Sequence, residues 1–157
     1  MIRPPIAADE PGLLALNAAH AVELSPLAPA ALRQLLARAF HARVADGAAA
    51  LLIAFDQDAD YGSPNFAWFR ARHRRFVYVD RVVVAPAARG RGLARLLYDD
   101  LFAAARAAGH ALVCCEVNLA PPNPASDAFH AALGFAEAGR DHLADRGKTV
   151  RYLTRGL

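Results

Sequence analysis

A strand, a glycine-containing turn and an amphipathic helix follow one another directly, and this unit constrains the fold more than any other feature. Residues 76–85 are rich in β-branched and aromatic side chains and end at Pro86, which predicts a buried strand. The turn AARGRG comes next. A helix closed by Gly109 is predicted after it, because apolar residues recur there at helical spacing: Leu93, Leu96, Leu97, Leu101 and Ala104.

Further helices and strands alternate on both sides of this unit. Helices are predicted from Asp9, from Ser63 to Phe69, from Asn123 or Ser126 to Leu133, and from Pro29 through Leu32, Leu35, Leu36, Ala39 and Phe40. Strands are predicted near residues 2–7, over 48–56 and over 111–119, and a hairpin over 135–140 and 148–154. This order predicts one α/β or α+β domain over 1–157, and the hairpin adds an antiparallel edge, which makes the sheet mixed.

Charge and composition narrow the function classes. Hydrophobic residues make up 55% and charged residues 21%, as in soluble globular proteins. The net charge of +3 suits a polyanionic ligand such as a nucleotide and does not require nucleic acid. One basic run is a solvated surface or a site for RNA or an acidic partner, and its lack of interleaved aromatics disfavours nucleic acid: Arg70, Arg72, His73, Arg74 and Arg75.

Two features indicate the cytoplasm. Cys114 and Cys115 are adjacent, so on a strand they point to opposite faces and are poorly placed to bridge each other, which favours small buried residues of a reducing compartment. The N-terminal segment lacks a signal-peptide pattern, and no apolar run is long enough to span a membrane. We therefore expect no membrane partner.

The glycine turn has the chemistry of a phosphate site. Gly90 and Gly92 let a ligand approach the backbone, and the following helix offers unpaired N–H groups and partial positive charge. Arginines surround the turn. A P-loop would need a lysine here, and a dinucleotide fingerprint would need glycine where Arg95 stands.

The turn instead resembles the GNAT superfamily of N-acetyltransferases. Arg89-Gly90-Arg91-Gly92-Leu93-Ala94 matches the signature of Arg or Gln, two residues, Gly, one residue, and Gly or Ala. A second segment agrees: the strand CCEVN, then Asn123, then AFHAALGF. The resemblance covers about residues 47–154. It implies a mixed, mostly antiparallel sheet of about six or seven strands, about four flanking helices and a V-shaped splay between the central strands.

The resemblance also implies the cofactor contacts, with acetyl-CoA as co-substrate and no metal. The backbone of Val82, Val83 and Val84 would pair with the pantetheine arm, and an N–H there would face the thioester carbonyl. Asn123 would touch the cofactor near the pantetheine or phosphate. The pyrophosphate would be held by the turn residues Arg89, Gly90, Arg91, Gly92, Leu93, Ala94 and Arg95.

Glu116 and His130 are the candidate catalytic residues. Glu116 lies late in an apolar strand, where a carboxylate is costly unless it is paired, so it is a base, an amine contact or half of an ion pair. Asp80 is a similar case, with pairing to an arginine favoured. His130 follows Phe129, where many relatives carry tyrosine, so it is a substitute acid or a contact to CoA or the core.

The predicted function is transfer of an acetyl group from acetyl-CoA to an amine by direct attack in a ternary complex. The alternative is a CoA-binding module with lost catalysis, because the usual tyrosine is absent. The acceptor, a small-molecule or peptide amine, is not identified, and a homodimer is left open. Acceptor contacts or packing residues are expected from the first helices and residues 56–75: Asn17, His20, Glu23, Tyr61, Phe66 and Trp68.

Overall fold

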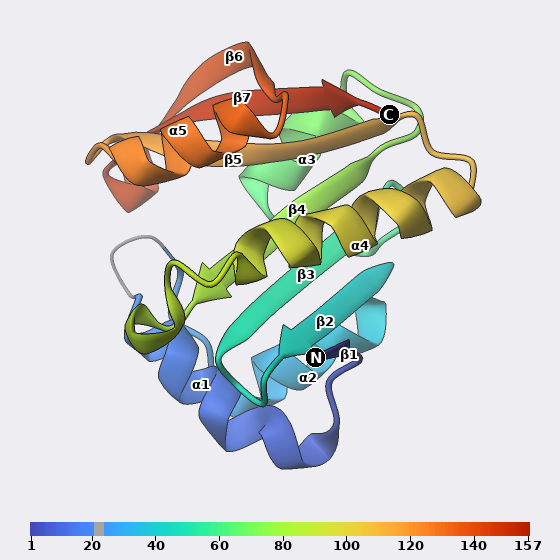
Figure 1. The fold of residues 1–157 in the computed structure, drawn as a ribbon. Helices are drawn as coiled ribbons and strands as arrows, with labels where there is room; N and C mark the ends of the chain where they lie inside the picture. The colour runs from blue at the N-terminus through green and yellow to red at the C-terminus, as the bar shows by residue number, and fades with distance from the viewer. Residues whose placement is uncertain (21–23) are drawn as a thin grey trace.

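A mixed sheet with helices on both faces forms the protein (Figure 1). The computed structural model describes residues 1–20 and 24–157, so the candidate Glu23 lies outside the described residues. The described part forms a seven-stranded sheet in the order β1-β2-β3-β4-β5-β7-β6. Its strands are β1 (Ile2–Arg3), β2 (His41–Ala45), β3 (Ala50–Asp56), β4 (Val77–Val84), β5 (Leu112–Ala120), β6 (Ala136–Leu143) and β7 (Lys148–Gly156).

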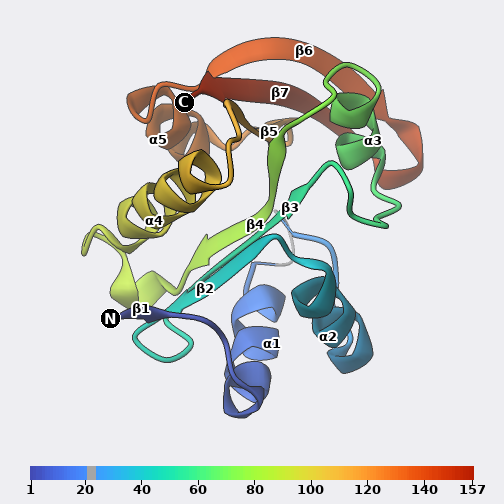
Figure 2. The same cartoon turned by 90° about the vertical axis from the view of Figure 1, so that its right-hand side faces the viewer.

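Helices cover the two faces unequally. They are α1 (Glu10–Ala18), α2 (Pro29–Arg38), α3 (Pro64–Arg70), α4 (Leu93–Ala107) and α5 (Pro124–Ala132). Helices α4 and α5 pack on one face, and α1, α2 and α3 on the other, as Figure 2 shows. Each face has its own apolar core. Cys115 belongs to the core under α4 and Cys114 to the core under α1–α3, and both thiols are free, as the alternation of strand side chains predicts.

The two central strands splay apart. β4 and β5 are the parallel neighbours, and they pair only through Val77 with Val113 and Tyr78 with Cys114. Beyond these pairs the strands diverge toward the end where α4 begins (Figure 1). The expected V-shaped splay of a mostly antiparallel sheet is therefore confirmed.

A bulge in β4 lies at the opening of the splay. On β3, Ile53 pairs with Arg81 while the next residue, Ala54, pairs with Val79. Asp80 is thus an extra residue without a partner on β3. Because a bulge bends a strand and re-aims its side chains, it determines where Asp80 and Arg81 point.

The secondary-structure prediction was wrong in one place, and it misjudged the length of the first strand and of the final hairpin. The helix predicted through Ala39 and Phe40 ends at Arg38, and β2 follows, although no strand was predicted there. The backbone of Ala39 is already extended, and Phe40 packs on the core under α4. Tertiary packing therefore ends the helix before the run of apolar residues at helical spacing has ended. The first strand is shorter than expected, and the final hairpin is longer. Among the described residues, no helix is long and apolar enough to cross a membrane.

Candidate active site

The glycine turn places an uncapped helix end at the surface. Gly90 and Gly92 have φ of +78° and +73°, a left-handed conformation that L side chains rarely adopt. Gly92 precedes the first residue of α4 without providing a side-chain cap. Apart from the glycine itself and its two chain neighbours, no residue of the described chain has an atom within 4 Å of the position where either glycine would carry a Cβ. The turn therefore offers backbone N–H groups and open space, as an anion requires.

Three exposed arginines surround this turn. Arg91 pairs with Asp46, Arg89 Nη2 lies 3.2 Å from His20 Nε2, and Arg95 Nε lies 4.0 Å from Asp99 Oδ2. Ion pairs between exposed side chains contribute little free energy, so a phosphate group can compete for these arginines.

A groove between β4 and α5 gathers many of the predicted cofactor residues. It is lined by Val82, Val83, Val84, Arg89, Ala94 and Asn123, together with His20, Leu24, Ala125, Ser126, Phe129 and His130. The other predicted turn residues, Gly90, Arg91, Gly92, Leu93 and Arg95, flank the groove without lining it. The side chain of Leu93 is buried in the core, so only its backbone is available to a ligand.

A second pocket, called here the inner pocket, passes between the splayed strands. Tyr78 belongs to the core under α1–α3, whereas Tyr98 and Cys115 belong to the core under α4, and all three line this pocket. The inner pocket therefore passes through the sheet. It shares five lining residues with the groove, so the two are contiguous: Leu24, Val82, Asn123, Ser126 and His130.

Glu116 is partly accessible in the inner pocket, and its pKa is strongly shifted. The Tyr78 hydroxyl donates a hydrogen bond to Glu116 Oε2 at 2.7 Å. Burial, helped by the negative charge of Asp80, raises the pKa of Glu116 to about 7, although the Tyr78 hydrogen bond opposes the rise. Among the described residues Glu116 makes no ion pair. It is thus poised to exchange a proton near neutral pH, as a general base must.

Asp80 lines the same pocket from the β4 bulge. Its Oδ1 accepts a hydrogen bond from the Tyr61 hydroxyl at 2.6 Å, and its Oδ2 lies 3.2 Å from Arg81 Nε. The predicted pairing with an arginine is confirmed. Burial raises the pKa of the Asp80 carboxyl, although both partners oppose the rise.

His130 is a buried histidine with both ring nitrogens bonded. Its Nδ1 lies 2.7 Å from the backbone oxygen of Ser126, and its Nε2 lies 2.7 Å from the Tyr98 hydroxyl. Because a carbonyl oxygen only accepts, Nδ1 carries the hydrogen, and in the neutral ring Nε2 accepts from Tyr98. Burial lowers the pKa of His130, which favours this neutral form.

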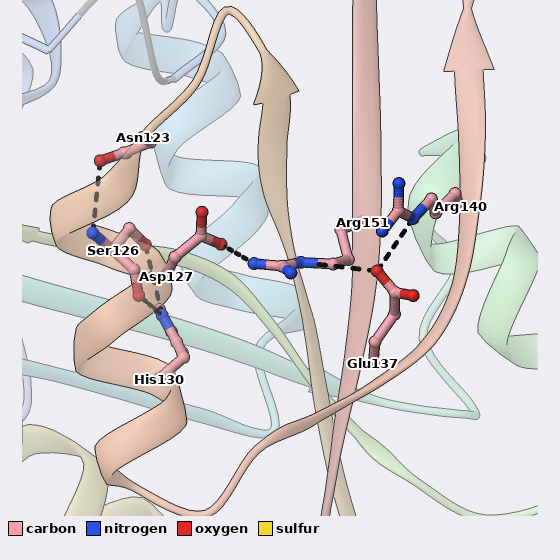
Figure 3. Close-up of polar contacts among 7 residues, drawn as sticks. All are labelled: Asn123, Ser126, Asp127, His130, Glu137, Arg140 and Arg151. Carbon is pink, nitrogen blue, oxygen red and sulfur yellow. Dashed lines mark hydrogen bonds and ion pairs between the residues drawn. The ribbon is translucent and has the colours of Figure 1, made fainter.

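Helix α5 is fixed at its start and on the side that faces β7 (Figure 3). The Asn123 side chain caps the helix by accepting from the Ser126 backbone N–H at 3.3 Å. Arg151 on β7 pairs with Asp127 on α5, and its Nε lies 3.7 Å from Glu137 Oε1. These contacts hold His130 and Asn123 at the junction of the two pockets.

The predicted acceptor residues divide between the site and the core. Tyr61 lines the inner pocket and His20 the groove. Phe66 is buried, Trp68 stacks on Tyr152 with ring centroids 4.2 Å apart, and Asn17 is buried as well.

The sequence analysis missed several residues of the inner pocket, including Tyr78, Asn65, Arg81 and Tyr98. Strand alternation offered a signal for Tyr78, which lies two residues before Asp80. Tyr98 stands beside Leu97 on an amphipathic helix, where an aromatic residue is usually core, so its position gave no signal.

The chain is similar in sequence to one known protein family and in fold to several solved structures. Residues 61–135 match the model of the acetyltransferase (GNAT) family. No curated protein sequence matches the chain.

Solved structures of similar fold cover nearly the whole chain. The ribosomal-protein-alanine N-acetyltransferase of Brucella melitensis has a TM-score of 0.76 at 24% identity, covering 100% of this chain and 99% of that one. Ard1 of Thermoplasma volcanium has a TM-score of 0.81 at 14% identity, covering 100% and 97%. The ribosomal-protein-S18-alanine N-acetyltransferase of Escherichia coli has a TM-score of 0.71 at 19% identity, covering 99% and 92%.

Proposed function

The chain belongs to the acetyltransferase (GNAT) family, and from that premise we propose that it transfers an acetyl group from acetyl-CoA to an amine in the inner pocket. The observation that carries the proposal is the junction of the groove with the inner pocket, because it connects a phosphate-type turn to a carboxylate with a pKa near 7. The groove suits CoA, since it combines open glycines, an uncapped helix end and the β4 backbone. Acetyl-CoA supplies the reactive thioester.

In this proposal Glu116 is the base. An amine attacks a carbonyl carbon only after it has lost its extra proton. Glu116 lines the inner pocket, and its pKa of about 7 lets it take that proton at neutral pH. The groove residues Val82, Val83 and Val84 position the thioester through the β4 backbone, and a free N–H on that strand would stabilise developing negative charge on the carbonyl oxygen.

His130 is the candidate acid for the departing sulfur. It lines both pockets, but the neutral ring carries its hydrogen on Nδ1, toward Ser126. Only the imidazolium form has a proton at Nε2. Since burial lowers the pKa of His130 while Glu116 must be ionised, few molecules hold both groups in the required state. We therefore assign His130 a smaller contribution than Glu116.

A screen of acetyl-CoA against classes of amines tests the proposal. The acceptors are amino acids, polyamines, aminoglycosides and peptides, including peptides that begin with alanine, because two of the structural neighbours are named for acetylating ribosomal-protein alanine. We expect release of CoA together with an acetylated amine detected by mass spectrometry.

A CoA-binding module without catalysis is the second candidate. The absence of a tyrosine after Phe129 and the neutral His130 favour it. CoA binding by calorimetry without acetyl transfer to any amine would support this candidate, and absence of CoA binding would contradict both.

A further inference from the structure

Two carboxylates in the inner pocket are held in the same way. The Tyr78 hydroxyl donates to Glu116 Oε2 at 2.7 Å, and the Tyr61 hydroxyl donates to Asp80 Oδ1 at 2.6 Å. Each tyrosine donates to one oxygen of its carboxylate, and the second oxygen accepts no hydrogen bond from that tyrosine. The second oxygens, Glu116 Oε1 and Asp80 Oδ2, belong to neighbouring strands that line a single pocket.

Asp80 Oδ2 is a buried oxygen that lacks a donor. The Asp80 side chain is 7% exposed, and although Arg81 Nε lies 3.2 Å away, neither atom forms a hydrogen bond within the described part of the chain. A buried carboxylate oxygen without a donor costs free energy, and native proteins rarely leave one. A bound molecule that supplied an N–H to this oxygen would recover that free energy.

The charges near the two carboxylates do not balance. Arg81 is buried, and its Nη1 already donates to Asn17 Oδ1 at 2.6 Å and to the Ser25 backbone oxygen at 3.0 Å. It can compensate one of the carboxylates. Arg146 also lines the pocket, but it is exposed. With both carboxylates ionised, the buried part of the inner pocket therefore carries one more negative charge than Arg81 compensates, which favours a bound cation.

We propose that Asp80 and Glu116 together bind the acceptor as a primary ammonium, and that Asp80 selects a charged amine over a neutral one. This inference rests on the proposed function. A primary ammonium carries three N–H groups: one donates to Asp80 Oδ2, and another transfers its proton to Glu116, which leaves the nitrogen lone pair free to attack. An alcohol or acylated amine of similar shape carries no charge and leaves the carboxylates uncompensated.

Calorimetry on the protein saturated with CoA tests this selection without requiring turnover. The probes are propylamine against propanol, and a short peptide beginning with alanine against its N-acetylated form. The variants are Asp80→Asn, which keeps the shape and removes the charge, and the control Asp60→Asn, which changes an exposed carboxylate close to Tyr61. We expect wild type and Asp60→Asn to prefer the ammonium, and Asp80→Asn to lose about 10- to 100-fold of that preference, as for a lost hydrogen bond between charged groups.

The outcomes separate this inference from the proposed function. The inference is overturned if Asp80→Asn keeps the full preference. It is also overturned if the wild type binds CoA but binds neither propylamine nor the peptide that begins with alanine. If Asp80→Asn fails to fold, Tyr61→Phe replaces it: the variant leaves Asp80 Oδ1 without its donor as well, so the ammonium preference should rise while CoA affinity is kept, and an unchanged preference overturns the inference. Ammonium selection without acetyl transfer supports this site and contradicts the proposed function.

Discussion

At the scale of single residues, the environment of Glu116 decides what its carboxylate can do. In water a glutamate is ionised and a weak base at neutral pH. Burial raises the pKa of Glu116 to about 7, with Asp80 adding to the rise, and the Tyr78 hydroxyl holds the side chain in place. Tyr61 faces the same pocket. The near-neutral pKa of this carboxylate is thus produced by desolvation and a like charge, in competition with one hydrogen bond.

The pH dependence of the rate follows from this balance. Only ionised Glu116 accepts a proton, so kcat/KM should fall as the pH drops through about 7. Tyr78→Phe removes a donor that stabilises the ionised form, which raises the pKa of Glu116 and moves this limb to higher pH. Rate profiles of the two enzymes check the shift. A limb that stays in place would mean that Tyr78 does not influence the base.

Replacing the carboxylate of Glu116 tests how much it contributes to turnover. Glu116→Gln keeps the shape of the side chain but cannot take the proton, so we expect turnover to fall by about 10²-fold or more. CoA affinity, measured by calorimetry, should barely change, because Glu116 lines the inner pocket and not the groove. Full activity of the variant would show that Glu116 is only structural.

His130 should have the opposite pH dependence. Only the imidazolium form of His130 carries a proton on Nε2, and burial lowers the pKa of His130. His130→Ala should therefore cost about tenfold in kcat at pH 6, below the usual range for general acids, and less at pH 8. The ratio of wild-type to variant kcat across pH measures this. A ratio independent of pH would make His130 a packing partner of Tyr98.

At the scale of elements, α4 and α5 shape the groove through their first turns. Helix α4 begins directly after a glycine with positive φ, and its apolar side chains anchor it to the sheet. Helix α5 begins at the Asn123 cap and is held by Arg151. Both helix starts adjoin the groove, where unpaired N–H groups favour an anionic ligand.

A pair of glycine variants separates backbone strain from loss of the ligand site. Gly92 and Gly109 lie at opposite ends of α4, with φ of +73° and +80°. Valine at either position should destabilise the fold by about 1–3 kcal/mol, because both conformations are strained for a branched side chain. Only Gly92→Val should also abolish CoA binding in calorimetry. Equal loss of binding in both variants would argue against the phosphate site.

At the scale of the whole molecule, the splay joins the groove proposed for CoA to the inner pocket proposed for the amine. The groove lies between β4 and α5, and the inner pocket reaches the side of α1–α3. Cys115 lines the inner pocket, but burial raises the pKa of its thiol well above the ordinary value, so it is a poor nucleophile. The proposed arrangement therefore favours direct transfer of the acetyl group from acetyl-CoA to the amine.

Steady-state kinetics should distinguish direct transfer in a ternary complex from transfer through a covalent intermediate. Initial velocities measured against both substrates should give intersecting lines, as a ternary complex requires. The protein incubated with acetyl-CoA alone should show no added acetyl group by intact mass. Parallel lines together with an acetylated protein would indicate a covalent intermediate instead.

The sequence by itself determined the elements whose signals are local. The strand over β4, the turn and α4 were predictable because β-branched residues, glycines and an apolar stripe act within a short stretch. The same is true of α5 and its Asn123 cap. The family's fold, and several of the residues that line the groove, could be predicted from these motifs.

Only the tertiary structure decided how distant residues meet. β2 was missed because its place in the sheet between β1 and β3, and the packing of Phe40 and α4, override a weak local pattern. The pairing of Glu116 with Tyr78, and of Asp80 with Tyr61, joins residues far apart in the chain, and the bulge that presents Asp80 appears only in the β3–β4 register. A pKa depends on burial and on neighbouring charges, and both are properties of the packed molecule rather than of the order of its residues.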